Sequence, residues 1–486
     1  MKRFLTLVLV LGMVAMLLAG CATPTDQPAP EPTKEATDTA ANEGAQEEAA
    51  EVVEQENPTV IGIELTNLGL DGTLVSKYEG QTINIATAEG DFAKALKHQA
   101  EYFQAISGAT VVVNTFPGES FMEKIQLDLN AGGAFDIVLM PIANIHGYAT
   151  TNLVMDMAPM LDEYASESYD VDDFLTGLFD TYARYDGKIV ALPYKPDVIM
   201  NFYRTDLFED EGIKAQFKEM YGRDLTVPKD TDEFLEVAKF FTKAHNPDSP
   251  TTYGYCANAG TGNLRWIWQN RLCAFGGDVV TANNEAAFNN EAGVKAMEYM
   301  LELATCAPAN WQEFDWGSSN AMFASGEAAM MEQWPGLYNT TQAEGSAVVG
   351  KVGASVTAGG APVLGGWALA ISAKTTNPEL AFKFCEFTTS KDGEILKMED
   401  TMDPCRTSNF EREEVMQFNP LYTALLESLS LGASIADVDV PIVTKELNDV
   451  LELGGQAVLN GEKTPQEALA WMESQFDKII SDAGLK

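Results

Sequence analysis

The sequence predicts an α/β protein with two lobes. Between residues 80 and 141, apolar strand-like runs alternate with amphipathic helix-like segments, which is typical of a parallel sheet with helices on its faces. In "DGKIVALPYKPDVIMNFYRTDLFEDEGI" a strand, a loop, a second strand and a helix start follow without a domain-length gap, and the last hundred or so residues look helical. A chain of 486 residues is long enough for two or three domains, and this array of elements suits two lobes. We therefore expect the chain to cross between the lobes more than once.

Three strands and two helices are expected at the start of the folded part. The strands lie in "QTINIATAEGD", "ATVVVNTFPG" and "AFDIVLMP", and the first of them spans 82–86. The helices cover 92–107 and "ESFMEKIQLDLNAGG", where apolar residues recur at helical spacing and glycines end the second helix. Ligands of such sheets bind beyond the carboxyl ends of the strands, so the candidate ligand-binding residues here are Glu89, Asp91 and Asn144.

Strands and helices continue to alternate through the middle of the chain. "DGKIVALPYKPDVIMNFYRTDLF" predicts a strand, a proline-bounded loop, a second strand and the start of a helix. Further helices are expected after Asp230 or Thr231, in "TGNLRWIWQNRLCAFGG" and in "EAGVKAMEYMLELA". "NAMFASGEAAMMEQWPG" predicts a helix, a turn and a strand followed by Trp334. Near the C-terminus, Thr464 as N-cap and Glu467 in the first turn predict a helix that starts with a capping box.

The N-terminus has the features of an export signal. Lys2 and Arg3 precede an apolar run from Phe4 to Leu18, which is short for a membrane-spanning helix. The run ends in "LLAGC", so that residues 1–20 resemble a bacterial lipoprotein signal peptide and Cys21 offers the thiol for lipid attachment. We expect an exported protein anchored by acyl chains to the outer face of a membrane. The alternative is an ordinary secretory signal with an accidental cysteine.

An acidic tether is predicted to follow the signal peptide, over residues 21–79. Between residues 26 and 56, ten acidic residues occur against Lys34 alone, and no aromatic residue is present. Such a segment buries too little apolar surface to fold. The folded part is therefore expected to begin near Gly80.

Charge and composition exclude several classes of partner. The net charge of −41 argues against nucleic acid, which needs a basic surface. The sequence has three His and no Cys-x-x-Cys pair, so we expect neither a metal site nor a cofactor. Beyond Cys21 the cysteines are odd in number, and either one or two disulfides or buried free thiols are compatible with Cys256, Cys273, Cys306, Cys385 and Cys405.

The stretch "APVLGGWALAIS" has two glycines directly before a tryptophan. Glycine allows the close approach of another group and unusual backbone angles. One interpretation is a tight turn into a buried strand with Trp367 in the core. The other is that Gly365 and Gly366 let the backbone approach a ligand beside the ring of Trp367.

An ordered set of motifs resembles the extracellular solute-binding proteins of ATP-binding-cassette importers, in the sugar-binding group called family 1. The set, spread over about residues 80–410, is "FDIVLMP", "GKIVALPYKPDVIMNFYRTDLFEDEGI", "VPKDTDEF", "FASGEAAMMEQWPG", "GGWALAISAKTTNPELAFKFCEFTTS" and "DPCRTSNF". The resemblance implies a periplasmic-binding-protein-like fold of type II, with a hinge of several crossing strands. It implies that lobe 1 comprises 80–199 and 368–403, and lobe 2 comprises 200–367 and 404–486.

The same resemblance implies a function. A sugar or polyol is captured between the lobes and delivered to permease subunits in the membrane, by a protein that we expect to be monomeric and not an enzyme. Two alternatives stay open: a secreted glycoside hydrolase, which needs a pair of carboxylates, and a binding protein of the same fold for a non-sugar solute.

Sugars present C–H faces to aromatic rings and hydroxyls to fixed polar groups, and several residues suit these roles. Trp334 aligns with a stacking tryptophan of the family and precedes Pro335–Gly336. Asn263, Arg265 and Trp266 open a helix whose free N–H groups could bind ligand oxygens. Trp268 and Trp311 are expected to pack in the core. The remaining candidates lie near the expected hinge: Trp367, Gly366, Asp197, Tyr194 with its neighbour Lys195, and Arg406.

Overall fold

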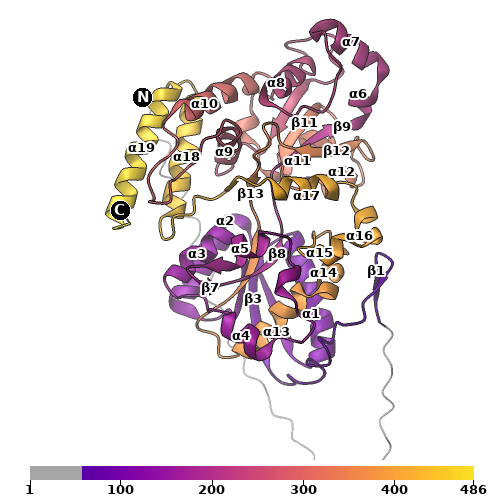
Figure 1. Cartoon of the computed structure of the whole chain (residues 1–486), viewed down its shortest axis with the longest axis vertical. Coiled ribbons are helices and arrows are strands. Elements are labelled where there is room, and N and C mark those ends of the chain that lie inside the picture. The colour runs from indigo at the N-terminus through magenta and orange to yellow at the C-terminus, as the bar shows by residue number, and fades with distance from the viewer. Residues whose placement is uncertain (1–56, 486) are drawn as a thin grey trace, which may run out of the picture. The chain divides into compact units, whose positions relative to one another are not determined.

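A computed structural model of the chain describes residues 57–485. These residues belong to one compact unit, which runs from Glu56 to Lys486. The predicted signal peptide, Cys21 and the first part of the predicted tether, to residue 56, lie outside the described residues. The α/β class is confirmed, because two separate sheets are each accompanied by helices (Figure 1).

The first lobe is built on a five-stranded sheet with the order β4-β3-β5-β14-β8. The three strands predicted at the start are present as β3 (Thr82–Ala88), β4 (Thr110–Phe116) and β5 (Ile137–Pro141), and they run parallel. β14 (Trp367–Ile371) pairs antiparallel with both β5 and β8 (Leu192–Lys195). The sheet thus joins strands from three distant parts of the sequence.

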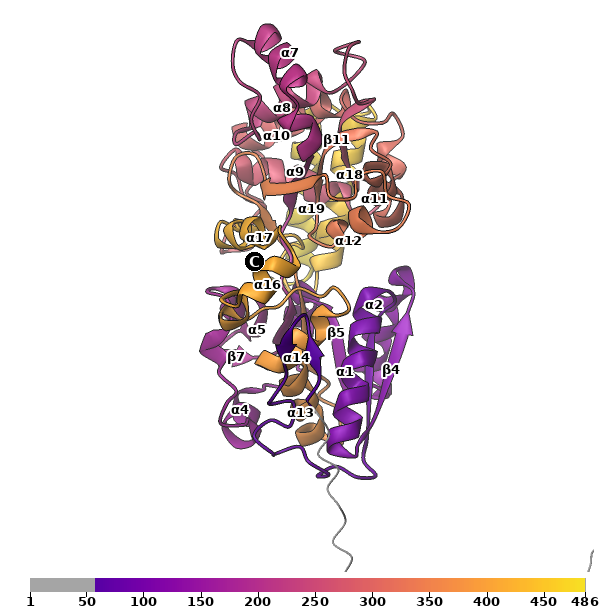
Figure 2. The ribbon, with the colours of Figure 1, turned by 90° about the vertical axis from the view of Figure 1, so that its right-hand side faces the viewer.

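The helices of the first lobe cover this sheet. The predicted pair is present: α1 (Asp91–Ser107) ends at Gly108, whose φ of 74° only glycine adopts readily, and α2 (Gly118–Leu127) continues into a π turn. Both pack beside β4 (Figure 2). The others are α3 (Ile142–Thr150), α4 (Ala158–Tyr164), α5 (Leu178–Ala183), α13 (Pro378–Thr389), α14 (Lys391–Met398) and α15 (Thr407–Phe410).

The second lobe is built on a four-stranded sheet with the order β10-β11-β9-β12. β10 (Tyr253–Ala257) and β11 (Ala328–Gln333) are parallel, whereas β9 (Met200–Arg204) is antiparallel to β11 and to β12 (Val352–Val356). Its helices are α6 (Thr205–Glu209), α7 (Glu211–Tyr221), α8 (Thr231–Phe240), α9 (Leu264–Ala274), α10 (Glu291–Ala304), α11 (Trp316–Ala324), α12 (Leu337–Gln342), α18 (Thr444–Leu459) and α19 (Pro465–Asp482).

Two helix starts confirm the capping signals. The Asp230 side chain accepts a hydrogen bond from the Glu233 N–H at the start of α8. At the start of α19, Thr464 and Glu467 form a reciprocal capping box. Each cap satisfies N–H groups that the helix itself leaves unpaired, so a local sequence signal is enough to fix these boundaries.

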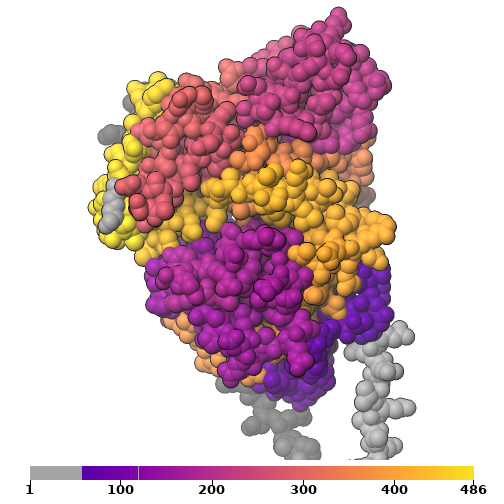
Figure 3. All heavy atoms as spheres, viewed as in Figure 1, coloured from indigo at the N-terminus to yellow at the C-terminus, as the bar shows by residue number. Residues whose placement is uncertain are grey.

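The chain crosses between the sheets in three places. It leaves the first sheet after β8 and enters the second at β9, and it returns through β13 (Val363–Leu364) to β14. After α15 it runs through α16 (Glu413–Phe418) to α17 (Tyr422–Ser430), which packs against β9 and β12. β13 also pairs with β15 (Ser434–Ile435). In Figure 3 the orange surface of this third crossing lies between the purple and the magenta surfaces.

The third crossing lies later than the expected boundary at residue 404. Arg406 forms a β-bridge with Phe174, and the Cys405 N–H donates to both carboxylate oxygens of Glu394, each at 3.0 Å. Residues 404–410 therefore pack with the first lobe, and their assignment to the second lobe is wrong. The backbone hydrogen bonds to buried groups of α14 hold this segment in place, and no local signal in "DPCRTSNF" shows that.

The folded part also begins earlier than Gly80. A hairpin of β1 (Thr59–Val60) and β2 (Ile63–Glu64) precedes a run of turns in which Leu65, Leu68, Leu70, Leu74 and Tyr78 are buried in the core of the first lobe. The prediction of a tether over 57–79 is therefore wrong. The acidic composition stops near Pro58, and the leucines after it supply the apolar surface that a folded segment needs.

The five cysteines of the described part are buried free thiols. Burial raises the pKa of the Cys273 thiol to about 12, and the charge of Asp278 adds to this effect. Within residues 57–485, no helix is long and apolar enough to cross a membrane.

Candidate functional site

A small cavity opens in the second lobe where two parallel strands end. Asn258 directly follows β10, and Gln333 ends β11, so their side chains meet at one edge of the sheet. The remaining lining comes from the first crossing, from α9, from β11 and from the residue after it: Ile199, Trp266, Ile267, Asn270, Glu332 and Trp334. Its volume of about 10 Å³ holds about one water molecule, so a larger solute requires these walls to separate.

Two tryptophans form the aromatic wall of this cavity. The rings of Trp266 and Trp334 pack edge to face, with centroids 5.1 Å apart and planes at 81°. Both are half-buried, which leaves part of each ring available. Trp334 follows β11 and Trp266 lies in the first turn of α9, so the strand end and the helix start together fix the pair.

The two glycines before Trp367 make room for other rings. A Cβ on Gly365 would lie 2.8 Å from the ring of Trp334 and 3.3 Å from the Cβ of Asp197. A Cβ on Gly366 would lie 2.1 Å from the ring of Tyr182, and the φ of Gly366 is +126°. Gly365 therefore borders the tryptophan wall of the cavity, whereas Gly366 is required by the packing of the first lobe.

Trp367 itself belongs to a different aromatic cluster. Its ring lies 4.3 Å from that of Phe92 and 6.0 Å from that of Phe121, between centroids. It is half-buried at the start of β14 and does not line the tryptophan cavity. The structure therefore does not bring Trp334 and Trp367 together in one lining.

Two unpaired polar atoms face this cavity region. Asn258 Oδ1 and Trp266 Nε1 are buried without a hydrogen-bond partner among the described residues. The first is an acceptor and the second a donor, and both residues line the cavity. Buried polar groups are nearly always paired, so this acceptor and this donor together match a group that can both donate and accept, such as a hydroxyl.

The charged lining residue, Glu332, is already neutralised from within the second lobe. Arg271 forms a buried ion pair with Glu332 Oε1, and Asn270 donates to the same oxygen at 3.2 Å. The hydroxyl of Tyr255 donates to Oε2 at 3.1 Å. The carboxylate thus fixes α9 against β10 and β11 rather than offering a free charge to a solute.

A second charged group lies at the first crossing. Lys195 Nζ and Asp197 Oδ1 are 2.7 Å apart, and both side chains are buried. Burial lowers the pKa of Lys195, but the charges of Asp197 and Asp403 outweigh burial and keep the pKa of Lys195 raised. Burial also raises the pKa of Asp403, to about 6, although Lys195 partly offsets this effect. Predicted residue Asp197 is thus a buried hinge carboxylate beside Gly365.

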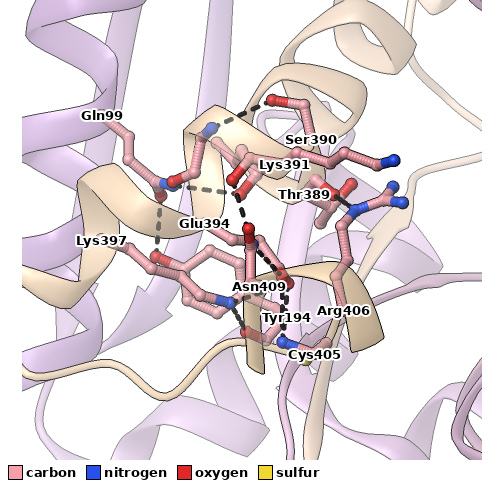
Figure 4. A network of polar contacts seen from close by, with 12 residues as sticks. Gln99, Tyr194, Thr389, Ser390, Lys391, Glu394, Lys397, Cys405, Arg406 and Asn409 are labelled. Carbon is pink, nitrogen blue, oxygen red and sulfur yellow. Dashed lines mark hydrogen bonds and ion pairs between the residues drawn. The ribbon is translucent and has the colours of Figure 1, made fainter. Parts of the chain in front are cut away.

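Two predicted site residues lie inside the first lobe, away from the tryptophan cavity. Tyr194 is fully buried, donates to Gln99 Oε1 at 2.9 Å and lies under Lys397 (Figure 4). Arg406 is 1% exposed and donates to the carbonyls of Thr389 and Asp170. The Tyr194 side chain joins β8 to α1, and the Arg406 side chain joins the end of α13 to Asp170, roles that sequence does not reveal.

The other predicted residues occupy the strand ends and helix start where the sequence places them. Glu89 and Asp91 are exposed after β3, and Asn144 is half-buried in α3 after β5. Asn263 is the N-cap residue of α9 and donates to the Thr261 carbonyl at 3.3 Å. The lining residues that sequence reasoning missed, Asn258 and Gln333 above all, lie at the ends of apolar strands, so the same strand-end rule applied to the second sheet would have found them.

Known proteins resemble this chain in sequence and fold. A probable amino-acid ABC transporter periplasmic-binding protein of Sinorhizobium fredii is 23% identical over 85% of this chain and 92% of its own length. The mannitol-binding protein of Pseudomonas aeruginosa is 24% identical over 73% and 82%. The crystal structure of a ribitol complex of an ABC transporter solute-binding protein from Agrobacterium radiobacter K84 has 24% identity and a TM-score of 0.70, and covers 83% of this chain and 100% of that one.

These similarities agree with the two-lobed architecture. The match to a family profile is broader than any single motif, since it extends from residue 86, in β3, to residue 395, in α14. It includes the strands of both sheets, the tryptophan pair and the first two crossings. The chain therefore belongs to the bacterial extracellular solute-binding protein family.

Proposed function

We propose that the protein binds a sugar or polyol at the tryptophan cavity and delivers it to an ABC permease. The observation that carries this proposal is the combination of two half-buried rings, Trp266 and Trp334, with an unpaired acceptor and an unpaired donor beside them. A sugar or polyol offers C–H faces to the rings and hydroxyls to the polar atoms. The mannitol- and ribitol-binding relatives support this solute class.

The same lining argues against an amino acid as the solute, although one relative is described as an amino-acid transporter component. An amino acid carries an ammonium and a carboxylate, and each needs a buried opposite charge or several hydrogen bonds. Among the lining residues Glu332 carries the one ionised side chain, and Arg271, Asn270 and Tyr255 already occupy its oxygens. A neutral polyhydroxyl solute fits this environment better.

Titration calorimetry with ribitol, mannitol, maltose and a set of amino acids tests the solute class. We expect saturable binding of at least one polyol or sugar and none of the amino acids. Trp266→Phe keeps an aromatic ring but loses the indole donor, so it should weaken binding by about tenfold, the effect of one hydrogen bond to a polar ligand. Trp471→Phe, on α19, is the matched control. Binding of amino acids alone would contradict the proposal.

We also propose that Cys21 carries a lipid anchor that keeps the binding lobes at the outer face of a membrane. The support is the order of the N-terminal signal: a basic start, a short apolar run and "LAGC". Extracellular placement agrees with the family to which the chain belongs.

A further inference from the structure

We propose that the first lobe carries a second binding site, for a small tetrahedral oxyanion such as phosphate or sulfate. A cavity of about 110 Å³ lies where the start of α14 meets the loops before α5 and after α15. This volume has room for several water molecules or one such anion. It shares no lining residue with the tryptophan cavity, so this inference does not depend on the proposed solute.

The central observation is an incompletely paired buried arginine. Arg406 lines this cavity and is 1% exposed. Its Nε donates to the Thr389 carbonyl and its Nη1 to the Asp170 carbonyl, both at 2.6 Å, and Nη1 lies 3.4 Å from an oxygen of Asp173. Nη2 has no partner among the described residues. A buried unpaired N–H of a guanidinium is costly, and an oxyanion is the ligand that satisfies it best.

The aromatic rings around Arg406 keep its guanidinium in one plane. The guanidinium carbon lies 4.3 Å from the ring centroid of Phe174 and 4.8 Å from that of Tyr169. Two backbone acceptors and two rings thus fix the direction of Nη2. A fixed guanidinium loses little entropy when an anion binds, which favours a specific site over a diffuse charge effect.

Two more cations line the same cavity, although the whole chain has a net charge of −41. Lys391 and Arg406 both approach Asp173, and their side chains point to the same side of the network in Figure 4. Arg412 has no carboxylate partner among the described side chains. Three cations therefore converge on a cavity in which the nearby carboxylates are already engaged.

The engaged carboxylates are Asp173 and Asp392. Asp173 accepts from the Ser408 hydroxyl at 2.7 Å and from the Ser408 N–H at 3.0 Å, in addition to its contacts with the cations. Asp392 accepts from the Asn67 N–H at 2.6 Å. Two further carboxylates contact lining residues and are likewise engaged: Asp71 accepts from the Ser168 N–H at 2.8 Å, and Glu386 accepts from the Ser166 N–H at 2.6 Å.

The start of α14 adds favourable backbone groups. The N-cap Ser390 accepts from the Gly393 N–H at 3.0 Å, while the first turn of this eight-residue helix presents further N–H groups that have no acceptor within the helix. Such a helix start favours a bound anion through its N–H groups and its dipole. Helix start, buried arginine and two further cations thus point to the same ligand chemistry.

Calorimetry on the folded protein with sodium phosphate and sodium sulfate, against sodium chloride at equal ionic strength, tests the site. We expect saturable binding of phosphate or sulfate and none of chloride. If sulfate binds as well as phosphate, the site takes fully charged oxyanions. If only phosphate binds, the site also uses the proton of the phosphate, which would face the carboxylate of Asp392.

Arg412→Gln is the informative variant, because this side chain has no structural ion pair to lose. We expect it to weaken oxyanion binding by at least about tenfold, as for a lost hydrogen bond to a charged group. Arg223→Gln, which removes a half-buried arginine paired with Glu236 in the second lobe, should leave binding unchanged. Circular dichroism of both variants checks folding. An absence of saturable oxyanion binding in the wild-type protein, or equal binding by Arg412→Gln, would overturn the proposal.

Discussion

Trp334 and Trp367 differ in what surrounds their rings. Trp334 packs edge to face with Trp266 at the cavity, whereas Trp367 packs on Phe92 and Phe121. We expect Trp334→Ala to reduce the binding free energy of the solute by about 2 kcal/mol or more, as for other aromatic anchors. The free energy of unfolding should fall by less than the about 3–5 kcal/mol lost with a fully buried tryptophan, because the ring is half-buried.

Trp367→Ala is the matched control for this prediction. It should lower the free energy of unfolding, by less than the about 3–5 kcal/mol of a fully buried tryptophan, and should leave solute affinity nearly unchanged. Calorimetric titration and urea unfolding of both variants make the comparison. A large affinity loss in Trp367→Ala with none in Trp334→Ala would move the solute site to the first lobe.

The buried carboxyl of Asp403 should make the free energy of unfolding depend on pH. Burial raises its pKa from the usual 3.8 to about 6, so the folded protein holds this proton more tightly than the unfolded chain. The contribution of Asp403 to the free energy of unfolding therefore falls as the pH rises from about 4 to about 6, and is constant above. Asp403→Asn removes this dependence.

The test compares urea unfolding of wild type and Asp403→Asn across this pH range. The stability of the variant relative to wild type should rise by about 1–3 kcal/mol between pH 4 and pH 7, since one pKa unit corresponds to about 1.4 kcal/mol. Asp172→Asn, at an exposed carboxyl, should show no such trend. A pH-independent difference for Asp403→Asn would show that its carboxyl titrates normally.

At the scale of elements, β14 depends on the glycine that precedes it. Gly366 has a φ of +126°, and a Cβ there would lie 2.1 Å from the ring of Tyr182. Gly366→Ala should therefore lower the free energy of unfolding by about 3 kcal/mol or more, from backbone strain together with the clash. Thermal and urea unfolding measure this loss.

Gly118→Ala is the control for Gly366→Ala. Gly118 begins α2, and a Cβ there would meet nothing within 4 Å. The substitution should be neutral or stabilise the fold by about 0.4–1 kcal/mol, because alanine reduces the freedom of the unfolded chain. Equal losses in the two variants would mean that the approach of Tyr182 to Gly366 does not limit the packing of β14.

At the scale of the whole molecule, solute binding should change how the lobes are arranged. The tryptophan cavity of about 10 Å³ is too small for a sugar, and its wall includes Ile199 of the first crossing. We expect an equilibrium between open and closed arrangements that a bound solute shifts toward the closed one. Small-angle scattering should show a smaller radius of gyration with saturating solute. An unchanged profile at saturation would argue against closure.

Cys21 gives a second prediction at this scale. In cells, Cys21→Ser should move the protein from the membrane fraction to the soluble fraction, because acyl chains rather than a spanning helix are proposed to hold it. Ser120→Ala, a substitution in α2, is the control and should leave the distribution between the two fractions unchanged. Retention of Cys21→Ser in the membrane fraction would contradict the lipid anchor.

The sequence by itself determined the local elements. The alternation around β3, β4 and β5 predicts the parallel core of the first sheet, and the capping signals at Asp230 and Thr464 predict two helix starts. These features follow from hydrophobic periodicity and from hydrogen bonds between neighbours in sequence, so a short segment contains all the information they need. The ordered set of family motifs predicts, in addition, the two-lobed fold.

Only the tertiary structure decided which side chains meet. Tyr194 and Arg406 were candidates for the solute site, yet hydrogen bonds to Gln99 and Asp170, each more than ninety positions away, hold them inside the first lobe. Trp266 and Trp334 line one cavity because the start of α9 packs against the end of β11, and Gly365 borders it because Trp334 lies against the connection between β13 and β14. Such contacts depend on the packing of distant segments, and a periodic pattern within one segment carries no information about its partners.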